Sequence, residues 1–156
     1  MADTLKILLA VDGSPFSDAA VRLIVQHYRS DNVEVQVLHA VDWLRELPDS
    51  FRFGEGPTYA QQILERREAS FERGRALVAR VAGELRAAGF NATTATLDAE
   101  ARRAIVDTAR QWPADLIVIG SHGRTGIDRF LLGSVAESVM RHTPCSVEIV
   151  REPKAS

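Results

Sequence analysis

The sequence predicts an α/β fold in which four helices surround a single five-stranded, parallel, doubly wound sheet of the Rossmann-like type. Two observations support this class. Short apolar runs alternate along the 156-residue chain with longer segments whose apolar residues recur at helical spacing. The first run, residues 5–11, is apolar almost throughout, which is typical of a parallel strand covered on both faces. The order of elements favours the strand order 3-2-1-4-5, and residues 1–156 are expected to form one domain.

Residues 5–41 are predicted to form a strand, a helix and a second strand. Asp12-Gly-Ser-Pro ends the first strand, because it supplies turn residues and a candidate helix cap. Apolar residues at helical spacing predict a helix over 17–28, and alternating valines predict a strand over 33–41. Such a unit joins two parallel strands, and its crossover is expected to be right-handed.

Residues 42–57 show no periodicity. The segment contains two prolines, two glycines and the isolated aromatic residues Trp43, Phe51 and Phe53. Loops of this length are uncommon in a compact domain unless they are functional. We therefore expect a long loop, which is either a lid over a ligand or a surface excursion.

The second part of the chain begins with a long amphipathic helix over 58–88. Leu64, Phe71, Val78 and Leu85 form one row of its inward face, and Gly89 is a suitable stop. After it we expect a weaker strand at a sheet edge over residues 90–97 and a helix over 105–112 that ends at Pro113. A strand over 116–119, a helix over 135–142 and a last strand over 145–150 follow.

The composition is that of an ordinary globular protein, with 46% hydrophobic and 26% charged residues. A net charge of −2 gives no general attraction to nucleic acid or to anionic lipid. No apolar run approaches the roughly 18 residues of a membrane span, and no signal-peptide pattern is visible. One cysteine, Cys145, excludes an internal disulfide. We expect a cytoplasmic protein without membrane insertion or a nucleic-acid partner.

Residues 120–134 lead from a predicted strand into a predicted helix and contain the chain's densest set of glycines. Gly120, Gly123 and Gly133 let the backbone close around a phosphate, and the helix adds unpaired N–H groups and the positive end of its dipole. Ser134 is expected to cap this helix and to offer its hydroxyl to a phosphate oxygen. The alternative is a turn that needs glycines only for their φ values.

Ligands of such sheets bind at the carboxyl ends of the strands where the strand order reverses, here between residues 5–11 and 116–119. Asp12 and Gly120 follow these strands and should be neighbours. Asp12 suits a phosphate-bound Mg²⁺, or else is only a turn residue. Arg124 either contacts a phosphate or is solvated.

Other polar residues of the chain give weaker indications. His122 either binds a phosphate or braces the loop, and His39 is expected to be a hydrogen-bonded, half-buried residue. No histidine pair has metal-ligand spacing, and neither Ser121 nor Cys145 has a base partner placed by spacing.

The spacing Gly120-x2-Gly123-x9-Gly133-Ser134 resembles the ATP-binding branch of the universal stress protein family. The resemblance extends over the chain and includes Lys6-Ile-Leu-Leu-Ala-Val-Asp-Gly-Ser and Val37-Leu-His-Ala-Val. It implies the adenine nucleotide alpha hydrolase-like fold, with Asp12 at the ribose or at Mg²⁺. It also implies that Ala10 lines the pocket, that the backbones of Val11 and Ala40 recognise adenine, and that the phosphates are held by Gly120, Gly123, Gly133, Ser134 and Val135.

The resemblance carries two further expectations. It implies a C2 homodimer through residues 145–151, which should form an edge strand that needs protection. Ala99-Glu-Ala101 departs from the family's usual Gly-x-Pro, at a turn that is not expected to affect nucleotide binding.

Two functions follow from this pattern. The first is a regulatory stress-response module that binds ATP, or another adenine nucleotide, with Mg²⁺ and then acts on an unknown protein partner. The second is a slow ATP hydrolase or an enzyme of nucleotidyl or phosphoryl transfer on the same fold. Catalysis needs a positioned base near the phosphates, and the sequence offers no dedicated candidate. We therefore expect a binding module with at most weak ATPase activity.

Overall fold

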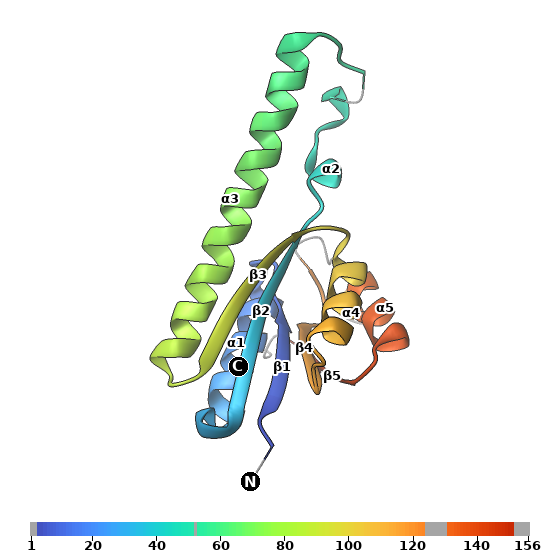
Figure 1. Ribbon diagram of the computed structural model, residues 1–156. Helices are drawn as coiled ribbons and strands as arrows, with labels where there is room; N and C mark the ends of the chain where they lie inside the picture. The colour runs from blue at the N-terminus through green and yellow to red at the C-terminus, as the bar shows by residue number, and fades with distance from the viewer. Residues whose placement is uncertain (1–2, 52, 124–130, 152–156) are drawn as a thin grey trace, which may run out of the picture.

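The computed structural model describes residues 3–51, 53–123 and 131–151. A five-stranded sheet of order β3-β2-β1-β4-β5, parallel throughout, lies between two layers of helices (Figure 1). This confirms the predicted class and strand order. The strands are β1 Leu5–Ala10, β2 Val33–Val41, β3 Asn91–Asp98, β4 Leu116–Gly120 and β5 Ser146–Val150. The helices are α1 Pro15–His27, α2 Trp43–Glu46, α3 Pro57–Ala87, α4 Ala101–Gln111 and α5 Ser134–His142, with 3₁₀ turns at Ser30–Asn32 and Asp49–Phe51.

Two apolar cores cover the two faces of the sheet. Ile7 and Leu9 of β1 pack with α1 and α3, whereas Leu8 and Ala10 pack with α4 and α5. Successive side chains of a strand point to opposite faces, so a strand between two helical layers carries apolar side chains on both faces. This is why the first strand of the sequence shows no alternation.

Strand β1 occupies the centre of the sheet. Leu9 is opposite Val37 of β2 on one side and Val118 of β4 on the other. At the amino end of β1, Lys6 N–H donates to the Asp115 carboxylate at 2.8 Å, and Asp115 N–H donates to the Lys6 carbonyl at 2.9 Å. The carboxyl ends of β1 and β4 are therefore neighbours, as predicted.

The segment after β2, predicted as a long loop, contains short helical turns that the sequence analysis missed. It contains the four-residue helix α2 and a 3₁₀ turn, and it runs beside the first half of α3 (Figure 1). Ser70 of α3 donates a hydrogen bond of 2.6 Å to the Glu46 carboxylate, and the guanidinium of Arg66 lies 4.4 Å from the centre of the Phe51 ring. These contacts with α3 stabilise helical turns that are too short to produce a sequence period.

Helix α3 is longer than the sheet it covers (Figure 1). Its buried residues begin at Ser70, and Leu64, predicted to face inward, is 64% exposed. That prediction is wrong because the apolar row continues past the end of the sheet. Gly89 ends the helix as predicted, with φ +95° and an N–H that donates to the Arg86 carbonyl at 3.0 Å.

Strands β3 and β5 form the two edges of the sheet. This confirms the edge position expected for the weakly hydrophobic third strand. Arg86 of α3 covers part of β3, because its guanidinium donates two hydrogen bonds to the Ala92 carbonyl, at 2.7 and 3.1 Å. Within the described ranges, no helix combines the length and the apolar character needed to cross a membrane.

Candidate functional site

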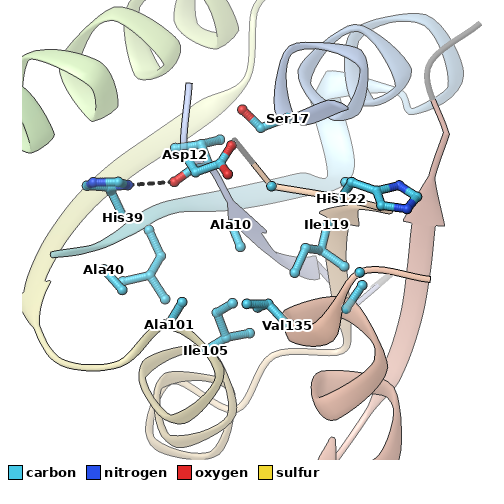
Figure 2. A pocket seen from close by; sticks show the side chains of 16 residues that line it. Ala10, Asp12, Ser17, His39, Ala40, Ala101, Ile105, Ile119, His122 and Val135 are labelled. Carbon is cyan, nitrogen blue, oxygen red and sulfur yellow. Dashed lines mark hydrogen bonds between the residues drawn. The ribbon is translucent and has the colours of Figure 1, made fainter. Parts of the chain in front are cut away.

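A cavity opens at the carboxyl ends of β1, β2 and β4 (Figure 2). It holds about 550 Å³ of empty space, open solvent at its mouth included. The predicted site residues that line it are Ala10, Val11, Asp12, Ala40, Gly120, Gly123, Gly133 and Val135. Ser134 is exposed and is not among the lining residues, and Arg124 lies outside the described residues.

One end of the cavity is apolar. Ala10, Ala40 and Ile119 come from strand ends, and Ala101, Ile105 and Val135 face them from the starts of α4 and α5 (Figure 2). Aliphatic walls on two sides form a slot that suits a flat, largely apolar ring. Ala101 thus contributes to the wall of the cavity, contrary to the expectation that the departure at residues 99–101 affects only a turn.

The other end is polar and contains Asp12 and Ser17. One carboxylate oxygen of Asp12 accepts the Ser14 N–H at 2.9 Å. Its other oxygen faces Gly123, where an added Cβ atom would lie 2.9 Å away. Asp12 supplies the carboxylate of the cavity wall, and within the described ranges no three His, Cys, Asp or Glu side chains form a metal cluster.

Two helices begin at this polar end. Helix α1 is capped by Ser14, whose hydroxyl accepts the Ser17 N–H at 3.1 Å. Helix α5 starts at Ser134 with Gly133 in the N-cap position and no side-chain cap. The predicted cap by Ser134 is therefore wrong, because this serine lies one residue too far along the helix. An uncapped helix start leaves N–H groups and a partial positive charge for an anion.

The glycines of this loop fit close packing rather than unusual backbone angles. None of Gly120, Gly123 and Gly133 has a positive φ, so the alternative that they serve only their φ values is wrong. A Cβ atom on Gly120 would lie 2.8 Å from the backbone of Phe16, and one on Gly133 would lie 2.6 Å from the Ser121 carbonyl oxygen. Both glycines are required by contacts of the protein with itself.

The structure brings Ser121 and His122 into contact, which the sequence spacing did not indicate. The Ser121 hydroxyl lies 3.0 Å from Nδ1 of His122, whose ring also packs 5.0 Å from that of Phe16. Ser121 is 1% exposed and does not line the cavity, so its hydroxyl is not placed as a nucleophile. Nε2 of His122 is buried without a hydrogen-bond partner. The pair holds the loop at the polar end.

His39 is buried and hydrogen-bonded, as expected, but its place in the cavity wall was missed. Its Nδ1 lies 2.7 Å from the Val11 carbonyl oxygen. The Val11 N–H donates to the Leu38 carbonyl at 2.9 Å and is not available to a ligand. The only signal in the sequence for a place of His39 in the cavity wall was its position beside Ala40, at the end of a strand next to the place where the strand order reverses.

The described residues of the 42–57 segment do not line the cavity. Glu46 instead binds Ser70 and Arg73 of α3. The proposed lid stays a prediction.

Comparisons with known proteins agree with this fold. The model of the universal stress protein family matches residues 4–151. The chain is 32% identical over 151 residues to universal stress protein MJ0531 of Methanocaldococcus jannaschii. The aligned residues cover 96% of this chain and 83% of that protein. The solved structure of hypothetical protein MJ0577 is similar with a TM-score of 0.82 and 25% identity, over 99% of this chain and 100% of the other. A universal stress protein family protein of Arabidopsis thaliana, solved with AMP bound, has a TM-score of 0.67 at 14% identity, over 96% and 93% of the chains.

Proposed function

Because the chain belongs to the universal stress protein family, we propose that its cavity binds an adenine nucleotide and that the protein acts as a nucleotide-dependent regulatory module. The observation that supports this most is the division of the cavity into an apolar slot and a polar end where two helices begin. The solved relative that holds AMP shares the fold at 14% identity, so the proposal rests on the cavity itself.

The base belongs in the apolar slot. Ala40 and Ala101 leave room between a strand end and the start of α4, and Ile105, Ile119 and Val135 complete the walls. Burial of a flat ring between aliphatic side chains is favourable because it removes apolar surface from water.

The phosphates belong at the polar end. The start of α5, which no side chain caps, attracts an anion with its N–H groups, and Gly120, Gly123 and Gly133 keep the approach open. Arg124 is proposed as a further phosphate contact, and the exposed Ser134 as a hydroxyl that reaches the outer phosphates.

Asp12 is the proposed ligand of Mg²⁺. A magnesium ion takes one or two carboxylates together with phosphate oxygens and water, and Asp12 is the one acidic side chain among the described residues that line the cavity, so it fits the role. The ion would neutralise the repulsion between this carboxylate and the phosphates. Asp12 would then orient the phosphates through the metal.

We favour a binding module over the alternative of a slow ATP hydrolase or nucleotidyl- or phosphoryl-transfer enzyme. A hydrolase needs a group that orients water in the cavity. Of the described residues that line the cavity, Asp12 is the proposed metal ligand, and Nε2 of His122 is enclosed by protein. Slow hydrolysis of ATP would then limit the lifetime of the nucleotide-bound state. An unknown protein partner would recognise that state.

The test is calorimetric titration of the nucleotide-free protein with ATP and Mg²⁺. We expect micromolar or tighter binding, and a loss of at least tenfold in the variant Ala101→Leu, whose larger side chain fills the slot. Ala87→Leu, an exposed position on α3, is the matched control and should bind like the parent.

Binding that is equal in both variants would place the nucleotide elsewhere, and no binding by the folded parent would refute the proposal. Gly133→Ala is unsuitable for this purpose, because its Cβ atom would strike the Ser121 carbonyl whether or not a ligand binds.

A further inference from the structure

We propose that His39 is a positioning residue that makes the cavity prefer a base with an exocyclic amino group, by fixing the Val11 carbonyl as a hydrogen-bond acceptor. The inference rests on the proposed function, since it concerns the base end of the same cavity. It assigns the selectivity to a side chain of β2 that acts through the backbone of the neighbouring β1.

The contact between His39 and Val11 identifies Nδ1 as a hydrogen-bond donor. Nδ1 of His39 lies 2.7 Å from the Val11 carbonyl oxygen, and both residues line the cavity (Figure 2). A carbonyl oxygen only accepts hydrogen bonds, so Nδ1 carries a proton and donates it. His39 is 6% exposed, which shields this bond from competing water.

The bond from His39 orients the Val11 carbonyl, which the hydrogen bond between the Val11 N–H and β2 does not fix. Strand β1 ends at Ala10, and the bond from the Val11 N–H to the Leu38 carbonyl fixes only the peptide that precedes Val11. The Val11 carbonyl belongs to the next peptide, which starts the turn at Asp12. The hydrogen bond from His39 therefore sets the direction of this carbonyl.

The His39 ring is itself held in place by α3. A Cβ atom on Gly74 would lie 2.8 Å from Cδ2 of His39 and 3.1 Å from Cγ2 of Thr96. The helix backbone thus lies directly against the ring, and only glycine permits this approach. The ring cannot turn away from Val11 without displacing α3.

The chemical consequence is that Val11 offers a ligand an acceptor and no donor. Its N–H is engaged by Leu38, and its carbonyl oxygen keeps one lone pair beside the bond from His39. An exocyclic amino group can donate to this lone pair. An oxo group in the same place would bring two acceptors together with no hydrogen between them and would itself lack a hydrogen-bond partner, at a cost of about tenfold or more in affinity.

The test compares ATP with ITP, whose bases carry an amino and an oxo group at the same position. Calorimetry with Mg²⁺ on the full chain should give the parent a preference for ATP of about tenfold or more. His39→Leu removes the donor, so the ratio of the two affinities should fall toward one. His39→Asn places an amide N–H near the position of Nδ1 and should restore most of the preference.

A general loss of structure would weaken both nucleotides alike and would not be rescued by asparagine, so the ratio separates positioning from stability. Circular dichroism checks that each variant is folded. If His39→Leu does not fold, His39→Gln takes its place, because its amide reaches toward the Nε2 position instead. An unchanged ratio in a folded variant without the Nδ1 donor overturns the inference.

The parent protein separates the two proposals. Equal binding of ATP and ITP overturns the inference and leaves the proposed function intact. Binding of neither nucleotide overturns both.

Discussion

Tyr28 shows how one side chain joins two parts of the fold. It follows the last residue of α1, and its hydroxyl donates a hydrogen bond of 2.7 Å to the carboxylate of Glu148 in the edge strand β5. Burial raises the pKa of Tyr28 to about 12, and the hydrogen bond and negative charge of Glu148 add to the effect. The neutral phenol is therefore the form that the folded protein stabilises.

The raised pKa predicts a loss of stability at alkaline pH. The folded pKa lies above the ordinary tyrosine value of 10.0, so the contribution of Tyr28 is complete below pH 10 and disappears as the pH rises toward 12. Tyr28→Phe should lower the free energy of unfolding by about 1 kcal/mol at neutral pH and should lack this alkaline loss. Urea unfolding of parent and variant across this pH range measures both effects. The same alkaline decline in both proteins would contradict the assignment.

At the scale of elements, the start of α5 depends on a close backbone contact. The Gly133 N–H donates to the Ser121 carbonyl at 2.7 Å, which brings the residue before α5 against the residue that directly follows β4. This contact places the start of the helix beside the cavity. Gly83 in α3 is a useful contrast, because an added Cβ atom there would meet nothing within 4 Å.

Alanine substitutions at these two glycines should have opposite effects. Gly133→Ala forces a Cβ atom to within 2.6 Å of the Ser121 oxygen, and we expect a loss of about 1–3 kcal/mol in the free energy of unfolding. Gly83→Ala should raise it by roughly 0.5–1 kcal/mol, because alanine has the better helix propensity. Thermal and urea unfolding of both variants test the pair. Equal stability of Gly133→Ala and the parent would mean that the loop can move aside at little cost.

The elements also show what the sequence could and could not predict. β1 was predictable because burial on both faces leaves a continuous apolar run, and Asp12 and Gly120 because the topology places the ends of β1 and β4 together. Helix α2 could not be predicted, since its four residues make little more than one turn. Leu64 was misplaced because a periodic pattern does not reveal where the sheet under a helix ends.

The candidate site was predictable to a similar degree. Its strand-end and loop residues follow from position in the sheet. The contributions of Ala101 and Ile105 depend on how α4 packs, and the bond between His39 and Val11 depends on the spacing of two strands and the approach of α3 at Gly74. No local pattern encodes those distances.

At the scale of the whole molecule, the open edge of β5 is the proposed dimer interface, over residues 145–151. The Val150 carbonyl accepts the Ser121 N–H at 2.8 Å and so faces the β4 side. The N–H and C=O of one residue point the same way from a strand, and successive residues alternate. Val147 and Ile149 therefore direct their backbone groups to the open edge, where a second copy can pair with them.

Sedimentation at micromolar concentration should give a dimer for the parent chain. Val147→Pro removes an outward N–H without removing a bond to β4, and should shift the protein to the monomer. Val147→Thr keeps the N–H and nearly the same shape, so it should remain dimeric. A monomeric parent, or a dimer that tolerates the proline, would refute pairing through this edge.

The central position of β1 also determines the order in which the strands of the sheet can pair during synthesis of the chain. One neighbour, β2, follows within the same strand–helix–strand unit, but the contact between Lys6 and Asp115, just before β4, spans 109 residues. Parallel pairing over such separations folds slowly, because a long loop must close first. As the chain leaves the ribosome, one edge of β1 keeps its backbone N–H and C=O groups unpaired until residues 116–120 emerge. The start of α5 at Ser134 emerges later still, so no nascent chain can form the complete cavity before this residue has been synthesised.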